Sequence, residues 1–267
     1  MKIDFAFVVL TYKTFSDVQD LIDSISTCYS EYCYKILIVN SFFDEHTELE
    51  IKEIARQNDC LFISTENKGY GHGNNVGIHF FNQRFDYDFL VIANPDTKVL
   101  SNDFNAEKFR GIECVIAPSI VNLKGKKQNP YWARKNRLSE KLVYTFFKKG
   151  GKLFFYLGIG INKIIRFMFN IKKDRPKKKI YAAHGSFLLF SSAALKKIND
   201  PYDENMFLFA EENLLAHTLE SLKIPTFYSS TIKILHKEDG SISAAHIDEN
   251  RELKKSIIYY YEKVNSK

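Results

Sequence analysis

The chain has 267 residues, of which 45% are hydrophobic and 26% are charged. These values are typical of a globular protein with a substantial core, and the low counts of 12 glycines and 6 prolines exclude a fibrous or low-complexity chain. The net charge of +6 is unevenly distributed, because residues 124–180 hold eighteen Lys or Arg against two acidic residues and the remainder of the chain is acidic. This division indicates that one part of the protein meets an anionic surface.

The N-terminus, the apolar windows and the cysteines together predict a cytosolic protein. The first residues predict a strand and not a secretion signal, because Asp4 interrupts the apolar run and no small-residue cleavage site follows. The most apolar window, 153–171, contains four polar residues and falls short of the roughly 18 uninterrupted apolar residues of a spanning helix. The four cysteines match neither a zinc-ligand spacing nor a redox CxxC motif, so we expect reduced thiols.

The first hundred residues alternate between apolar runs and amphipathic stretches, which is typical of βαβ units around a mostly parallel sheet. Ser16 with Gln19, and Thr47 with Glu50, form S/T-x-x-E/Q capping boxes that predict two helix starts. The expected strands lie near 4–10, 35–40, 60–64, 88–93 and 113–117, and the expected helices near 17–29, 48–58 and 73–84.

A basic, aromatic segment interrupts this alternation. Regular periodicity stops after 113–117 and resumes at 181–190, so we divide the chain into a first half at 1–123, a largely helical insertion at 124–180 and a second half at 181–267. In the second half we expect a helix at 211–222, short strands at 225–229 and 232–236, and a last helix at 249–263.

Four motifs follow one another along the chain. They are VVLTY at 8–12 with Asp44 after the second strand, ENKGYGHGNNVG at 66–77, NPD at 94–96, and FAEENLL at 209–215 followed by HKEDGSIS at 236–243. This ordered set resembles the family 2 inverting glycosyltransferases, in the rhamnosyltransferase-like branch of bacterial surface polysaccharide synthesis. The resemblance covers residues 3–120 and 181–243, and it implies a GT-A-type, Rossmann-like α/β fold.

The NPD motif follows the apolar run LVIA, and ligands of open α/β sheets bind at the carboxyl ends of strands. A departing nucleotide diphosphate gains charge, which a loop carboxylate can neutralise through Mg²⁺ or Mn²⁺. Relatives have a DxD-type motif here, whereas this chain has Asn94 first and keeps only Asp96, which weakens the expected metal affinity and leaves open a site that depends less on metal. The resemblance implies that Asp96 and His236 hold the metal. The alternatives are that Asp96 closes an N-P-D turn and that His236 is a structural hydrogen-bonding residue.

The Gly-rich stretch before the helix at 73–84 is a second candidate element of the donor site. Glycine permits close backbone approach, and a helix N-terminus offers free N–H groups that suit a diphosphate or its sugar, although an ordinary tight turn has the same composition. For Thr11 and Tyr12 the alternative is an ordinary strand end, and for Asp44 it is a solvated loop acid. The resemblance implies the following donor-binding residues: Thr11, Tyr12, Asp44, Asn67, Gly69, Gly71, Asn75, Asn94 and Asp96.

Inverting transfer is a single displacement, so the attacking hydroxyl must lose its proton to a carboxylate. Glu211 and Glu212, at the start of a predicted helix, are the candidates, and the alternative is that they only stabilise that helix terminus. Relatives use the second acid of this pair, which implies Glu212. The residues that resemble an acceptor-side loop are His184, Gly185 and Ser186.

The segment 141–173 interleaves Lys and Arg with eight aromatic residues, which favours an interfacial helix on an anionic membrane. The alternatives are a covered core hairpin and a nucleic-acid surface, and we expect no nucleic-acid partner. The predicted protein is a cytoplasmic transferase, peripheral on the inner face of the cell membrane, that moves a hexose or deoxyhexose such as rhamnose from a dTDP- or UDP-sugar to a glycan or lipid-linked acceptor in capsule or O-antigen synthesis.

Two rival functions remain open. A non-catalytic scaffold subunit of a polysaccharide assembly complex is suggested by Asn94 and by the basic insertion. A sugar nucleotidyltransferase has the same kind of α/β sheet. It needs a Gly-rich, Arg- and Lys-containing loop after the first strand, however, and LTYKTFSD does not supply one.

Overall fold

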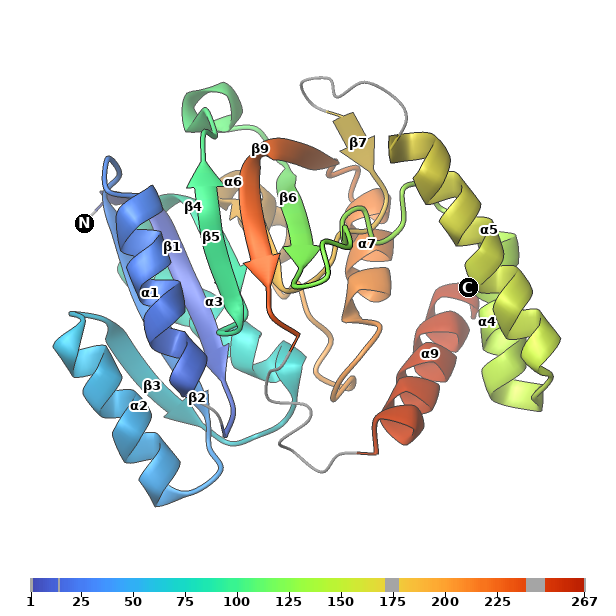
Figure 1. The fold of residues 1–267 in the computed structure, drawn as a ribbon, viewed down its shortest axis with the longest axis horizontal. Coiled ribbons are helices and arrows are strands. Elements are labelled where there is room, and N and C mark those ends of the chain that lie inside the picture. The colour runs from blue at the N-terminus through green and yellow to red at the C-terminus, as the bar shows by residue number, and fades with distance from the viewer. Residues whose placement is uncertain (1, 14, 171–177, 239–247, 267) are drawn as a thin grey trace.

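The structure is a computed structural model that describes residues 2–13, 15–170, 178–238 and 248–266. Its strands are β1 (Lys2–Thr11), β2 (Tyr34–Ser41), β3 (Leu61–Thr65), β4 (Asp86–Ala93), β5 (Thr97–Asn102), β6 (Val115–Asn122), β7 (Lys178–Ile180), β8 (Phe187–Ser191) and β9 (Thr226–His236). Among the described residues these strands form one sheet in the order β3-β2-β1-β4-β8-β6-β9-β5, with β7 paired to β9 (Figure 1). Only β5, β7 and β8 run against the other six strands, so the predicted mostly parallel α/β sheet is confirmed.

Helices pack on both faces of the sheet. They are α1 (Ser16–Cys28), α2 (Glu45–Gln57), α3 (Tyr70–Arg84), the 3₁₀ turn η1 (Ala106–Phe109), α4 (Arg137–Lys149), α5 (Lys152–Asn170), α6 (Ser192–Ile198), α7 (Glu211–Ser221) and α9 (Glu249–Asn265). Successive side chains of a strand point to opposite faces, so Phe5 and Phe7 of β1 join a core cluster with α1 and α2. Ala6 and Val8 join a second cluster with α3, α6 and α7. A sheet buried on both faces explains the long apolar runs in the sequence.

Two predicted helix starts are wrong in detail. Helix α2 begins at Glu45, before the predicted Thr47 cap, because the Asp44 carboxylate accepts the Thr47 N–H at 2.7 Å and acts as the N-cap. Ser16 is already the first residue of α1, and Phe15, which precedes it, makes no side-chain capping bond. The capping-box pattern therefore located both helices but not their caps.

The second half of the sheet differs from the prediction in its strands. The two predicted strands at 225–229 and 232–236 are one strand, β9, which keeps pairing with β6 through a register shift between Pro118 and Ser119. Strand β5 was not predicted, although it pairs with β9 and packs on α1. The stretch 181–190 contributes only its last residues to β8, and 181–186 form a loop.

The predicted helical insertion consists largely of α4 and α5, which form an antiparallel pair at one end of the molecule beside α9 (Figure 1). Gly158 of α5 lies so close to α4 that an added Cβ atom would meet Val143 at 2.9 Å. The Tyr144 and Tyr261 rings stack at 4.2 Å between α4 and α9, and the Tyr260 hydroxyl donates to buried Glu140 at 3.1 Å. Among the residues that the structure describes, no helix is long and apolar enough to cross a membrane.

Candidate functional site

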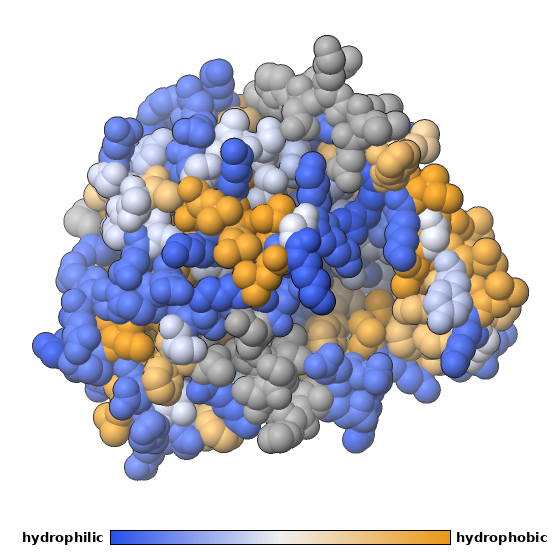
Figure 2. All heavy atoms as spheres, viewed as in Figure 1, coloured by the Kyte–Doolittle hydropathy of each residue, from blue (hydrophilic) through white to orange (hydrophobic). Residues whose placement is uncertain are grey.

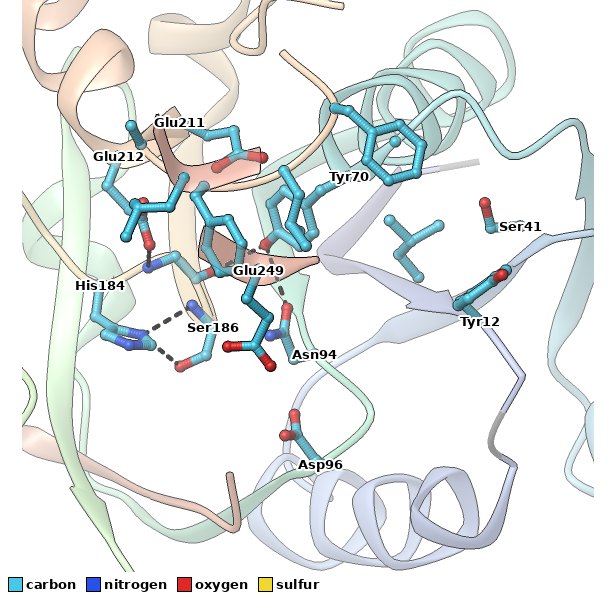
Figure 3. A pocket seen from close by; sticks show the side chains of 18 of the residues that line it. Tyr12, Ser41, Tyr70, Asn94, Asp96, His184, Ser186, Glu211, Glu212 and Glu249 are labelled. Carbon is cyan, nitrogen blue, oxygen red and sulfur yellow. Dashed lines mark hydrogen bonds between the residues drawn. The ribbon is translucent and has the colours of Figure 1, made fainter. Parts of the chain in front are cut away.

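A pocket of about 530 Å³ opens where β1 and β4 end, and it is closed on the far side by the residues before α7 and by the start of α9 (Figure 3). Open α/β sheets bind ligands at this edge. Four of the predicted site residues do not line the pocket, namely Thr11, Asp44, Gly71 and Asn75. The predicted residues that line it are Tyr12, Asn67, Gly69, Asn94, Asp96, His184, Gly185, Ser186, Glu211, Glu212 and His236.

Asp96 and His236 lie together at one side of this pocket. Their side chains are only 9% and 10% exposed, and Asp96 Oδ2 lies 3.3 Å from His236 Nε2. The tight turn around Pro95 is closed by Thr97, whose N–H and hydroxyl both donate to the Asn94 carbonyl. The Asp96 carboxylate is therefore not needed for the turn and faces the imidazole instead.

The other imidazole nitrogen, His236 Nδ1, lies 2.9 Å from Gln128 Oε1, and Gln128 Nε2 donates to Glu238 at 2.6 Å. This chain of contacts orients the amide so that its oxygen faces Nδ1, which then carries the proton. Nε2 is the ring nitrogen that faces Asp96, so one carboxylate and one imidazole can share a divalent cation. Among the described residues, no group of three or more His, Cys, Asp or Glu could hold a metal by itself.

Asn94 has a different role from the acid that it replaces. Its side-chain oxygen accepts from the Tyr70 hydroxyl at 3.2 Å, and the same hydroxyl lies 3.0 Å from the Gly185 carbonyl. The Asn94 N–H donates to the Ser186 carbonyl at 2.8 Å. Asn94 therefore ties the end of β4 to α3 and to the loop before β8, and its amide oxygen is already engaged.

Glu211 and Glu212 form a pair at the start of α7, in which Glu211 is buried and Glu212 is partly buried. The Gly185 N–H donates to Glu212 Oε1 at 3.2 Å, whereas Glu211 Oε1 is buried without a hydrogen-bond partner among the described residues. Burial raises the pKa of both carboxyls above the ordinary value, and the neighbouring Glu212 charge adds to this effect for Glu211, whose pKa rises to about 8. One of the two carboxyls is therefore protonated near neutral pH.

The loop at 184–186 connects this pair to Asp96 and His236. His184 Nδ1 accepts the Ser186 N–H at 3.2 Å, and the His184 ring lies 5.3 Å from the His236 ring. Burial lowers the pKa of His184 to about 3, so its imidazole is neutral. The His184 backbone N–H donates to the Asn129 side chain, which fixes the loop to the chain that follows β6.

The Gly-rich stretch is helical, which differs from the predicted loop. Helix α3 begins at Tyr70, three residues before the predicted start, with Gly69 as its N-cap at φ +105°. A Cβ atom at Gly73 would meet Leu10 at 2.3 Å, and one at Gly69 would meet the Phe207 carbonyl oxygen at 2.4 Å. These glycines therefore allow α3 to pack closely on β1 and on the 202–207 segment, and of the two only Gly69 reaches the pocket.

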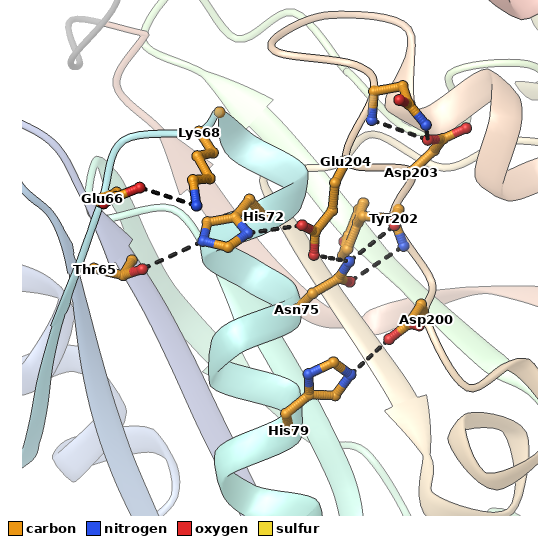
Figure 4. A network of polar contacts seen from close by, with 12 residues as sticks. Thr65, Glu66, Lys68, His72, Asn75, His79, Asp200, Tyr202, Asp203 and Glu204 are labelled. Carbon is orange, nitrogen blue, oxygen red and sulfur yellow. Dashed lines mark hydrogen bonds and ion pairs between the residues drawn. The ribbon is translucent and has the colours of Figure 1, made fainter.

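A network of polar contacts holds α3 to the segment before α7 (Figure 4). Asn75 donates to the Tyr202 carbonyl at 2.9 Å and to Glu204 at 3.1 Å, and His72 Nδ1 lies 2.8 Å from the same carboxylate. Beside this network, Gly71 packs against the Tyr202 side chain. The hydrogen-bonding groups of Asn75 are occupied within the protein. Neither Asn75 nor Gly71 lines the pocket, so the donor-binding role of these two residues stays a prediction.

In the VVLTY motif, Leu10 and Tyr12 line the pocket, whereas Thr11 does not, and Asp44 also lies outside the lining. Thr11 is fully buried and its hydroxyl donates to the Val39 carbonyl at 3.3 Å, and Asp44 serves as the α2 cap. Both side chains therefore have a structural role, and their predicted donor contacts stay predictions.

The last motif, HKEDGSIS at 236–243, is described only in its first three residues. His236 and Glu238 line the pocket, and Lys237 turns away from it to pair with Asp17 and Asp20 of α1. Residues 239–243 of the motif lie outside the described residues, so the structure does not test them.

Several pocket residues were not predicted from the sequence. Glu249, Leu253 and Ile257 enter from α9, which carries no motif, and Glu238 lies two positions after His236. The backbone before α7 is also unusual, because Phe209 and Ala210 have positive φ angles of 71° and 63°. Such strain in non-glycine residues is concentrated at functional sites, but it leaves no signal in the sequence.

Comparisons with known proteins concern the fold and the relatives of this chain. No family model matches the chain. The low-salt glycan biosynthesis hexosyltransferase Agl10 of Haloferax volcanii is 24% identical over 218 residues, which cover 78% of this chain and 59% of that relative. The chain therefore spans about three fifths of the length of the curated relative that it matches.

Two solved structures share the fold. GalNAc-T7, crystallised with UDP, GalNAc and Mn²⁺, has a TM-score of 0.61 at 10% identity, over 88% of this chain and 44% of that chain. TarS of S. aureus has a TM-score of 0.54 at 14% identity, over 88% of this chain and 36% of that chain. The chain thus has the fold of the GT-A glycosyltransferases and is homologous to a hexosyltransferase of glycan biosynthesis.

Proposed function

We propose that this chain is an inverting glycosyltransferase that moves a hexose or deoxyhexose, such as rhamnose, from a dTDP- or UDP-sugar to a glycan or lipid-linked acceptor in cell-surface polysaccharide synthesis. The observation that carries the proposal is that one pocket joins the Asp96–His236 pair to the Glu211–Glu212 pair. The first pair suits a diphosphate with its cation, and the second suits proton removal from a hydroxyl.

Glu212 is the proposed base. The two carboxyls are close enough for each to oppose the charge of the other, and the Gly185 N–H stabilises the charged form of Glu212. The proton of the pair then resides on Glu211. In the transfer, the acceptor oxygen forms a bond to the anomeric carbon while its proton passes to Glu212. The bond from that carbon to the diphosphate breaks, and the nucleoside diphosphate leaves with the electron pair.

Asp96 and His236 would hold Mg²⁺ or Mn²⁺. The donor set fits, because a carboxylate oxygen and an imidazole nitrogen lie 3.3 Å apart, and the diphosphate and water can supply the other ligands. The bound cation would neutralise charge on the leaving diphosphate. Since this pair contains only one carboxylate, we expect the free protein to bind the cation weakly and the nucleotide complex to bind it more tightly.

The test measures nucleoside diphosphate release from a panel of dTDP- and UDP-sugars, with an acceptor extract present. Glu212→Gln should lower turnover by about 10²–10⁴-fold, the usual contribution of a general base. Glu45→Gln is the matched control, because Glu45 is also a glutamate in the first turn of a helix but is exposed and outside the pocket lining. Equal turnover of both variants contradicts the assignment of the base.

Asp96→Ala in the same assay should abolish the response of turnover to added Mn²⁺. Calorimetry with UDP and dTDP then separates the rival functions, since a scaffold subunit binds neither nucleotide. Product anomers, followed by NMR, test inversion directly, because retention of the donor configuration excludes a single displacement. We also propose that the protein works at the cytoplasmic face of the cell membrane, where lipid-linked acceptors are held.

A further inference from the structure

Helix α5 carries an apolar face that no other described element covers. Among the described residues, seven of the thirteen large hydrophobic side chains that are exposed lie on this helix, and Leu153, Ile164 and Phe167 are 63–68% exposed. Figure 2 shows hydrophobic residues gathered over the end of the molecule that α4 and α5 form. The seven are Leu153, Phe154, Tyr156, Leu157, Ile164, Phe167 and Met168.

These side chains form a stripe along the helix. At 100° per residue, all except Phe154 fall within an arc of about 120°. The opposite side of α5 is attached to the protein: Asn162 donates to the Tyr131 carbonyl at 3.2 Å, and Arg166 donates to the Lys127 carbonyl at 2.9 Å. The helix is therefore held by one side, and its apolar stripe faces outward.

The charges around the stripe favour an anionic partner. Residues 137–170 contain seven Lys or Arg and a single acid, Glu140, which is buried and bonded to Tyr260. Lys152 and Lys163 are exposed and fall along one border of the stripe. Two copies of this surface would bring like charges together, whereas anionic lipid headgroups complement them.

We propose that α5, resting on α4, docks on an anionic lipid membrane, with the apolar stripe in the headgroup region and the lysines on the lipid phosphates. The docking itself does not depend on the proposed function, and only its consequence for a lipid-linked acceptor rests on that function. Helix α4 packs on α9, and α9 lines the pocket with Leu253 and Ile257, so docking would bring one pocket wall to the membrane where a lipid-linked acceptor lies.

The test is co-sedimentation of the full chain with phosphatidylcholine vesicles, with and without phosphatidylglycerol, at low ionic strength. The wild type should bind the anionic vesicles and release them at high salt. Ile164→Asp with Phe167→Asp should weaken binding at least about 100-fold, since each side chain contributes about ten-fold on burial. Leu49→Asp is the matched control, because Leu49 is 65% exposed on α2.

Lys152→Gln with Lys163→Gln should weaken binding by about 25-fold, about five-fold for each lysine. Absence of wild-type binding, or equal binding by the stripe variant and the Leu49 control, overturns the proposal. Self-association of the wild type without vesicles, lost in the stripe variant, also overturns it, because a second copy would then cover the face. Asp96→Ala should keep vesicle binding, and the stripe variant should keep nucleoside diphosphate release, so failure of either proposal is seen separately.

Discussion

Gly69 should be the glycine at which alanine is least tolerated. Its φ of +105° and ψ of 175° lie in a region that only glycine adopts readily, which costs an alanine about 1–3 kcal/mol. The new Cβ atom would also lie 2.4 Å from the Phe207 carbonyl oxygen and 2.7 Å from its Cα. Backbone cannot rotate away as a side chain can, so overpacking adds about 1–3 kcal/mol. We expect Gly69→Ala to lower the free energy of unfolding by about 2–6 kcal/mol.

Gly150 supplies the matched control for this prediction. It has a similar backbone, φ 86° and ψ −167°, but nothing lies within 4 Å of the position of its Cβ atom. Gly150→Ala should therefore cost only the backbone part, and the difference between the two variants measures the close approach to Phe207. Urea unfolding followed by circular dichroism gives both values. Equal losses in the two variants would refute the packing argument.

Three further predictions concern buried polar groups. Glu211 has a raised pKa of about 8 in the folded protein, so its contribution to stability is fully present below the unfolded pKa of 4.5 and is lost as the pH rises through about 8. Glu211→Gln should therefore flatten the decline of the melting temperature between these two pH values. An unchanged slope of melting temperature against pH contradicts the raised pKa. Tyr260→Phe leaves Glu140 without its donor and should cost about 1–3 kcal/mol in urea unfolding, whereas a loss near zero would mean that water replaces the bond. Asn75→Ala should lower stability by about 1–3 kcal/mol and leave UDP affinity unchanged in calorimetry, and weaker UDP binding would restore its predicted donor role.

Much of the fold was predictable because local periodicity reports buried faces. The strands of the first half alternate with amphipathic helices, and their observed bounds lie close to the predicted ones. Strand β5 was missed because only two of its six residues are buried. Its pairing partner, β9, also lies more than 120 residues away in the chain. The start of α3 was missed because glycines that permit close packing look like a loop in sequence.

The sequence by itself determined which residue types stand at the ends of the strands and helices: Asp96 after β4, the glutamate pair at the start of α7 and His236 at the end of β9. Only the tertiary structure decided which of the predicted residues share a pocket, because that depends on contacts between distant segments. In the folded chain, Asn75 donates a hydrogen bond to the Tyr202 carbonyl and Asn94 accepts one from the Tyr70 hydroxyl. Helix α9 forms one wall of the pocket. Hydrogen-bond partners and burial are properties of the packed chain, and no local pattern encodes them.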